Sequence, residues 1–257
     1  MDRRSFVFSV AGAVACPLCV DLVGRPALAA GDEMHWSYDG AVGPDFWGGL
    51  DASYAACGAG TQQSPIDLSG AVSAQFDAGS IKWNPIKLGS IVNNGHTIQV
   101  NAPNGGHMEL DGSRYDLLQF HFHHMSEHTV DGKRFPMEAH FVHKAANGDG
   151  LSVVGMFIVE GPESPVLAPI WAAFPEEEGE ASIDASVDPR GLLPTSSAAF
   201  RYAGSLTTPP CSEVVAWIVL KDPVSASVDQ IAAFAKLFPN NFRPAQPLNR
   251  RFVLFSE

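Results

Sequence analysis

The sequence predicts a mainly β protein built on one large sheet, and three features of the chain carry that prediction. Between residues 81 and 159, short runs of β-favouring residues are separated by Asn-Gly, Asp-Gly and Pro-containing breaks, which is typical of many successive strands. Residues 119–123 (Gln-Phe-His-Phe-His) alternate polar and aromatic side chains, so an extended strand places the two kinds on opposite faces. A continuous apolar run from Val214 to Leu220, bounded by Pro210 and Pro223, indicates a buried central strand.

The expected strands and turns follow one another through the middle of the chain. The strands are Ile91–Val92, Thr97–Val100, His107–Leu110, Leu117–His123, Ala139–Val142 and Leu151–Val159. Asn94-Gly95, Asp111-Gly112 and Asp131-Gly132 are the expected tight turns, because both positions of such pairs tolerate the left-handed backbone that hairpin turns require. Residues 35–67 are rich in aromatic residues, Gly and turn formers without sustained periodicity, so we expect an irregular segment pinned by aromatic side chains.

Two helices are expected outside the strand region. Pro165–Phe174 is compatible with a short helix, and the three glutamates at 176–178 that follow it are expected to form a solvated loop. Ser227-Val228-Asp229-Gln230 resembles a capping box. Apolar residues then recur at helical spacing, at Ile231, Phe234, Ala235 and Phe238. This pattern predicts a surface helix packed on the sheet.

Length and composition bound the possible functions. The 257 residues are 46% hydrophobic and 17% charged, which suits one domain with a sizeable core. The formal net charge of -12 argues against nucleic acid or an anionic membrane as a partner, because both would repel the chain. A small or neutral substrate fits this composition, and both a monomer and a homodimer remain open.

Residues 1–30 have the pattern of a cleaved export signal. Arg3-Arg4 precedes an apolar run, and small residues at 27–30 offer a cleavage site, which indicates the twin-arginine route. The expected mature protein is a single domain over residues 31–257, located in the periplasm or secreted.

Alternatives for this segment involve membrane attachment. The apolar run is short for a membrane anchor and is interrupted by Pro17 and Asp21, while a lipid anchor through Cys16 has a poor acylation motif around it. Signal removal leaves two cysteines, Cys57 and Cys211. An even pair in an exported protein indicates a disulfide, with two buried free thiols as the alternative.

Histidines suggest a metal site on the predicted sheet. Strand alternation places Gln119, His121 and His123 on one face, and in the next strand it places Glu138 and His140 together. If these strands are antiparallel neighbours, three imidazoles converge, which is the ligand count of a catalytic zinc with an open fourth position. The alternative is that these are polar side chains on an exposed sheet face.

A zinc site of this kind needs partners and a proton route. Zinc-bound histidines usually donate their second ring N–H to an oxygen, and Gln119 and Glu138 are placed to accept it. Zinc lowers the pKa of water at the open position from about 15.7 to about 7, which supplies a hydroxide nucleophile. A proton must then leave, and His96, beside the Asn94-Gly95 turn, is a candidate relay because an unperturbed histidine has a pKa of about 6.5. The alternative for His96 is an ordinary solvent-exposed turn histidine.

Motifs along nearly the whole expected mature chain match one family. They are 35–38 (His-Trp-Ser-Tyr), 63–67 (Gln-Ser-Pro-Ile-Asp), 93–96 (Asn-Asn-Gly-His), 119–123 (Gln-Phe-His-Phe-His), 126–130 (Ser-Glu-His-Thr-Val), 138–143 (Glu-Ala-His-Phe-Val-His), 204–210 (Gly-Ser-Leu-Thr-Thr-Pro-Pro) and 246–248 (Gln-Pro-Leu). Together they resemble the α-class carbonic anhydrases, specifically the secreted or periplasmic bacterial kind. The resemblance implies a mostly antiparallel twisted sheet of about ten strands, with zinc at the base of a conical cleft.

The same resemblance implies an activity and a set of roles. The activity is reversible hydration of carbon dioxide to bicarbonate and a proton by zinc-hydroxide attack, with a side esterase activity in some members. The zinc ligands are His121, His123 and His140, and Gln119 and Glu138 hydrogen-bond to them. Thr207 accepts a hydrogen bond from the hydroxide and donates its own to Glu127. His96 is the proton shuttle, and the residues that hold the ordered waters are Tyr38, Asn94, Gln99 and Thr208.

Carbon dioxide is apolar, and the resemblance implies a matching pocket beside the hydroxide. Its residues are Val142, Val153, Leu206, Thr208, Val215 and Trp217. The family uses the positions of His128 and His143 as buried structural hydrogen-bonders, and Cys57 and Cys211 match the disulfide of exported members. Two positions depart from well-known animal members, because His124 and Lys144 stand where those carry tryptophan.

Two other classes of function compete with the enzyme. Some relatives have lost ligands and act as binding or adhesion modules, but here all three histidines, Thr207 and Glu127 are present. A periplasmic metal buffer using the stretch Phe120–His128 would need neither Thr207 nor Glu127 and would bind several ions.

Overall fold

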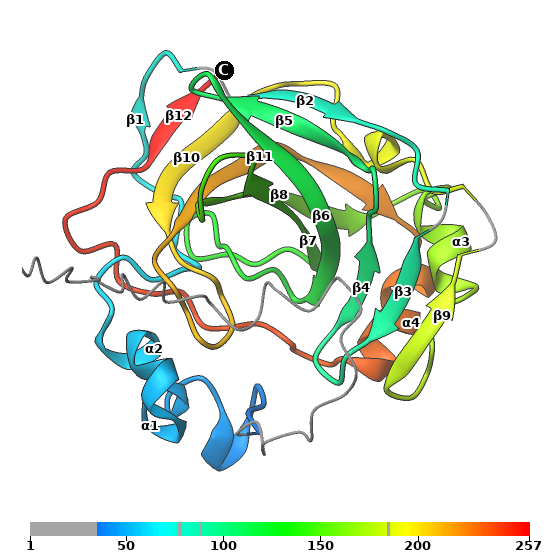
Figure 1. Ribbon diagram of the computed structural model, residues 1–257, viewed down its shortest axis with the longest axis horizontal. Coiled ribbons are helices and arrows are strands. Elements are labelled where there is room, and N and C mark those ends of the chain that lie inside the picture. Colours follow the sequence, from blue (N-terminus) through cyan, green and yellow to red (C-terminus); the bar gives the residue numbers. More distant parts are fainter. Residues whose placement is uncertain (1–34, 77–78, 88, 184–185) are drawn as a thin grey trace, which may run out of the picture. The chain divides into compact units, whose positions relative to one another are not determined.

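One large sheet dominates the computed structural model, which describes residues 35–76, 79–87, 89–183 and 186–257. The predicted export signal at residues 1–30 lies outside these ranges. Twelve strands of the described chain join in the sheet, and ten of them follow the order β1-β12-β10-β11-β8-β7-β6-β4-β3-β9, while β5 pairs with both β2 and β6 (Figure 1). The strands are β1 (Val72–Ser73), β2 (Ser80–Trp83), β3 (Ser90–Asn93), β4 (Ile98–Asn101), β5 (Gly106–Leu110), β6 (Ser113–His124), β7 (Met137–Ala145), β8 (Leu151–Glu160), β9 (Gly179–Ser182), β10 (Ala199–Gly204), β11 (Val215–Ala226) and β12 (Leu254–Ser256).

Most neighbouring strands run antiparallel. Among the named strands, the parallel pairs are β1 with β12 and β11 with β8. The prediction of a large, mostly antiparallel sheet is therefore confirmed.

The central strand β11 is longer than the sequence indicated. It lies buried between β10 and β8, as predicted, but it continues past Pro223, which we expected to mark its boundary. The register with β8 shifts between Leu220 and Val224. Proline has no N–H to donate to a ladder, so it is tolerated inside a strand at such an irregularity.

Two of the predicted tight turns have the backbone that their sequences favour. Asp111 and Gly112, between β5 and β6, have φ angles of 50° and 74°. Asp131 and Gly132 have φ angles of 51° and 72°. Positive φ at both central positions is the hairpin geometry that Asp-Gly favours. The first pair joins β5 to β6, and the second closes an isolated bridge between Val130 and Lys133.

Helices are short and lie around the sheet. They are η2 (Gly40–Val42), α1 (Trp47–Leu50), η3 (Ala52–Tyr54), α2 (Ala55–Ala59), α3 (Leu167–Trp171), η4 (Pro189–Leu192) and α4 (Val228–Leu237). The first four lie within residues 35–67, where the sequence indicated an irregular segment. Each is only three to five residues long, which is too short to produce a helical periodicity in the sequence. Within the described ranges, no helix is long and apolar enough to cross a membrane.

The helices α3 and α4 confirm the two helical predictions. The Ser227 side chain accepts from the Gln230 N–H, and the Gln230 side chain accepts from the Ser227 N–H, which completes the capping box. The Trp171 indole N–H of α3 donates to the Gln230 carbonyl at 2.7 Å. The Trp171 ring also lies 5.0 Å from the Phe122 ring, so the pair covers one face of the sheet.

The two faces of the sheet carry different cores. On one face, the cross-strand row Phe141, Val154 and Ile218 belongs to the cluster that also contains Phe122. On the other face, the next row, Val142, Val153 and Trp217, belongs to a second cluster. Because side chains alternate, the second face is also the face of the histidines.

Candidate metal centre

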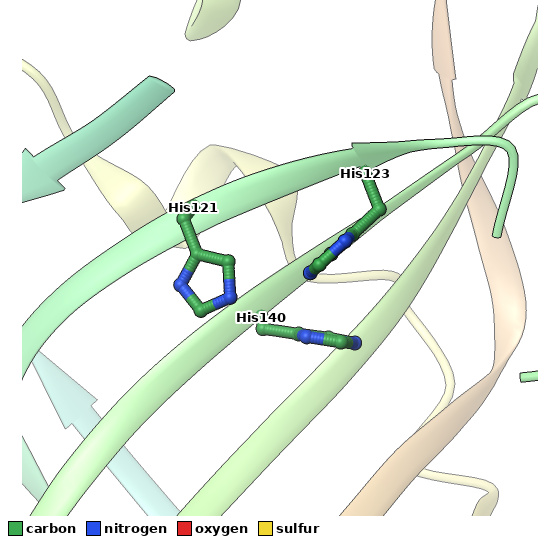
Figure 2. A group of neighbouring side chains, drawn as sticks. All are labelled: His121, His123 and His140. Atoms are coloured by element: carbon green, nitrogen blue, oxygen red, sulfur yellow. The ribbon is translucent and has the colours of Figure 1, made fainter. Parts of the chain in front are cut away.

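Three histidines from β6 and β7 converge on the second face of the sheet. His121 lies directly opposite His140 in the antiparallel register, and His123 lies opposite Glu138. One nitrogen of each of His121, His123 and His140 lies within 4.8 Å of the others. Figure 2 shows the three rings turned toward a shared space. The predicted antiparallel pair of strands therefore brings the three imidazoles together.

The outer nitrogen of each ring is held by an oxygen. His121 Nδ1 lies 2.9 Å from Gln119 Oε1, and His140 Nε2 lies 2.8 Å from Glu138 Oε1. His123 Nδ1 lies 2.7 Å from the backbone carbonyl oxygen of Asn241. Because these oxygens accept, the ring nitrogens that face them carry the protons.

The inner nitrogens are left with lone pairs facing the shared space. These are Nε2 of His121, Nε2 of His123 and Nδ1 of His140. His123 Nε2 is buried and has no hydrogen-bond partner within the described chain. Three neutral imidazole donors with their second nitrogens fixed are the ligand set that zinc takes, so the residues present fit this metal.

Burial disfavours a proton on two of these rings, His121 and His123. Burial, followed by repulsion from His123 and His140, lowers the pKa of His121 well below its ordinary value. Burial also lowers the pKa of His123, although attraction to Glu127 opposes this shift. Neutral rings present lone pairs, so a cation is favoured over a proton at this site.

Glu127 is a buried carboxylate beside the three rings. Its Oε1 accepts the Arg243 backbone N–H at 2.8 Å. Its Oε2 lies 3.6 Å from His123 Nε2 and 3.8 Å from His140 Nδ1 and has no hydrogen-bond partner among the described residues. An unsatisfied buried oxygen needs a partner, and Thr207 does not donate to it in this structure. The hydrogen bond from Thr207 to Glu127 stays a prediction.

Glu138 is fully satisfied by four hydrogen bonds. Its Oε1 receives His128 Nδ1 at 2.7 Å and His140 Nε2 at 2.8 Å, and its Oε2 accepts the Glu127 and His128 backbone N–H groups. Burial raises the pKa of this carboxyl, but attraction to His128 and His140 and their hydrogen bonds outweigh burial and hold the pKa well below its usual range. Glu138 is therefore a charged anchor for the His140 ring.

The two remaining motif histidines are structural, as predicted. His128 is buried, and its Nε2 lies 2.6 Å from the Tyr202 hydroxyl. His143 accepts the Trp83 indole N–H at 2.8 Å, and burial lowers the pKa of His143 to about 4. Neither ring has a nitrogen free for the metal centre.

A cavity of about 110 Å³ adjoins the histidines. Its lining includes two of the three histidines, His121 and His123, and all five residues predicted for the proton route. The lining residues are Trp36, Tyr38, Asn94, His96, Thr97, Gln99, Gln119, His121, His123 and Thr208. The His96 ring stacks on Trp36, with centroids 3.7 Å apart and planes 10° apart. Burial and repulsion from His35 lower the pKa of His96, and attraction to Glu178 opposes them.

The apolar residues predicted to contact the substrate lie together beside His140. Val142, Val153, Val215 and Trp217 belong to the second core cluster, and Leu206 packs against it. The Trp217 ring lies 4.9 Å from the His140 ring. Of the six predicted pocket residues, Thr208 is the one that lines the cavity, and contact between the others and a substrate stays a prediction.

The disulfide between Cys57 and Cys211 is formed, with Cα atoms 5.0 Å apart. The Cys211 N–H donates to the Thr208 carbonyl at 2.9 Å. His124, one of the two departures, has its backbone N–H bound to Asn241 Oδ1 and its ring Nδ1 accepting the Asn240 N–H. Its ring is therefore engaged away from the metal centre.

Two residues that contact the metal centre, Asn241 and Arg243, were not predicted from the sequence. Asn241 holds His123 through its backbone carbonyl, and Arg243 holds Glu127 through its backbone N–H. Backbone groups carry no side-chain signature, and both contacts span more than 110 positions of sequence.

Comparisons with known proteins agree with this geometry. A family model described as eukaryotic-type carbonic anhydrase matches residues 42–257. A carbonic anhydrase of Nostoc sp. is 44% identical over 239 residues, covering 90% of this chain and 89% of the relative. A carbonic anhydrase of Pectobacterium carotovorum is 43% identical over 236 residues, covering 89% of this chain and 93% of that protein.

A solved structure supports the same assignment. The α-carbonic anhydrase of Thermovibrio ammonificans, in complex with the inhibitor sulfanilamide, is 46% identical, with a TM-score of 0.83 over 86% of this chain and 99% of its own. The match to the family model includes the strands of the sheet and the three histidines. The chain therefore belongs to the eukaryotic-type, or α-class, carbonic anhydrase family.

Proposed function

We propose that this protein is a zinc enzyme that interconverts carbon dioxide and bicarbonate with a proton, using His121, His123 and His140 as the metal ligands. The observation that carries the proposal is the convergence of three imidazole lone pairs, each fixed by an oxygen on the far side of its ring. When bound there, zinc lowers the pKa of water from about 15.7 to about 7 and supplies hydroxide as the nucleophile.

The chain's own groups orient the reactants. In the proposed active site, the Thr207 hydroxyl donates a hydrogen bond to Oε2 of Glu127, which leaves the Thr207 oxygen as an acceptor toward the nucleophile. Oε2 is available for this bond because it has no partner among the described residues, while Oε1 already accepts the Arg243 N–H. Carbon dioxide is uncharged, and the apolar side chains around Trp217 give it a surface without competing hydrogen bonds.

Proton export runs through the 110 Å³ cavity. His96 accepts the proton at a ring nitrogen and releases it to solvent buffer. Tyr38, Asn94, Gln99 and Thr208 hold the water chain between His96 and the metal centre. An imidazole suits this step because an unperturbed histidine titrates near neutrality, and in His96 the attraction of Glu178 opposes the lowering of the pKa by burial and by His35.

Export from the cytoplasm is part of the same proposal. The disulfide is a bond expected of an oxidising compartment, and it supports a location in the periplasm or outside the cell. On the pattern of residues 1–30, the proposal includes their cleavage and a mature domain over 31–257. A side esterase activity would use the same nucleophile.

Chelation should remove the activity reversibly. We expect the mature protein to hydrate carbon dioxide in stopped-flow measurements, to lose the rate after chelation and to regain it with one equivalent of zinc. Absence of any zinc-dependent hydration rate would refute the proposed enzymatic function. Uptake of several ions per chain without a rate would instead favour the metal buffer.

Replacing His96 by alanine tests the proton route. We expect kcat in weak buffer to fall on the order of 10- to 100-fold, within the range of positioned acid–base groups, and to recover with added imidazole. The ratio kcat/KM should stay unchanged, because it does not include the export step. Equal kcat in weak buffer would exclude His96 as the main shuttle.

A further inference from the structure

An acidic loop is docked on the turn that carries His96. Residues 176–178 precede β9, whose first residue, Gly179, pairs with Asn93 at the end of β3. The Asn93 side-chain amide donates to the Pro175 carbonyl at 3.0 Å. Figure 1 shows β9 alongside β3. Contacts at both ends of the loop therefore fix it against the turn between β3 and β4.

The carboxylate of Glu178 lies against this turn. A Cβ atom added to Gly95 would lie 2.7 Å from Glu178 Oε1 and 3.1 Å from its Cδ. Gly95 directly precedes His96 and has a φ of 80°. The sequence indicated only a solvated loop at 176–178. Glu178 is indeed exposed, but its carboxylate has a defined place against Gly95, the residue before His96.

The charged and titratable groups around His96 are few. The His35 ring is 6.4 Å and the Tyr38 ring 6.5 Å from the His96 ring, measured between centroids. His121 and His123 face it across the cavity. Repulsion from His35 disfavours a proton on His96, and Glu178 is the carboxylate of the described chain that favours one.

We propose that Glu178 is a positioning residue for proton export, a fixed negative charge that stabilises the His96 imidazolium while it carries the proton. The proposal rests on His96 being the shuttle. The proton arrives at a His96 ring nitrogen and leaves to a buffer base, and Glu178 acts only through its charge.

The test compares Glu178→Gln with Glu177→Gln, a matched control from the same exposed loop. We expect NMR titration of the His96 ring to show its pKa about 0.5 lower in Glu178→Gln, because removal of a nearby negative charge destabilises the imidazolium. Glu177→Gln should shift it much less. His35→Gln should raise it, because a repelling group is lost.

Kinetics give a second readout. In weak buffer, Glu178→Gln should lower kcat for hydration about twofold, because a less basic acceptor takes the proton more slowly, and kcat/KM should not change. An unchanged His96 titration in Glu178→Gln, or an equal shift in Glu177→Gln, would overturn the proposal. Because the titration needs no turnover, this result is distinct from failure of the proposed enzyme, which would show as no zinc-dependent rate in the parent protein.

Discussion

Replacement of His123 by alanine is expected to remove tight zinc binding and carbon dioxide hydration together. His123 Nε2 is the buried inner nitrogen that has no other partner in the described chain, so its loss leaves two imidazoles where three are needed. Loss of outer partners alone usually costs about 10- to 100-fold in metal affinity, and loss of a direct ligand should cost more. The measurements are zinc content after dialysis and the stopped-flow rate.

His124→Ala is the matched control, because it removes the neighbouring imidazole of the same strand. That ring accepts the Asn240 N–H and does not face the metal centre, so this variant should keep one zinc per chain and its activity. Circular dichroism establishes that both variants are folded. Full zinc occupancy in folded His123→Ala would show that the ligand assignment is wrong.

The metal centre was predictable because its signal is periodic. In a strand, residues two apart share a face, so His121 and His123 had to point the same way. The third ligand then required only that the strand with His140 pair with this strand and present His140 on the same face. The observed register places His121 opposite His140.

The parts that escaped prediction depend on contacts between distant segments. The carbonyl of Asn241 and the N–H of Arg243 complete the centre, yet any residue has these groups. Glu178 belongs to a run of three glutamates that looks like ordinary surface. Its place beside Gly95 follows from the pairing of β9 with β3, which alternation within either segment does not reveal.

Arg243 connects the disulfide to the metal centre. Its side chain is buried and donates to the Cys57 carbonyl and to Gln63 Oε1, both at 2.8 Å. Its backbone N–H donates to Glu127 Oε1. On the other side of the bond, the Cys211 N–H holds the Thr208 carbonyl. The disulfide therefore joins two segments that bear on the nucleophile. Arg243 links Glu127 to the Cys57 segment, and Thr207 directly precedes Thr208, which is bound to Cys211.

Removing the disulfide should therefore cost activity as well as stability. For the double variant Cys57→Ser and Cys211→Ser, we expect the free energy of unfolding to fall by about 2 to 5 kcal/mol, since the bond closes a loop of 154 residues. Under conditions where the variant is still folded, kcat/KM should fall about 10-fold, because small displacements of orienting groups are costly. Denaturant unfolding and stopped-flow hydration measure the two effects on the same samples. Reduction of the parent protein should reproduce both, and a lower stability with unchanged kcat/KM would show that the loops keep their places without the bond.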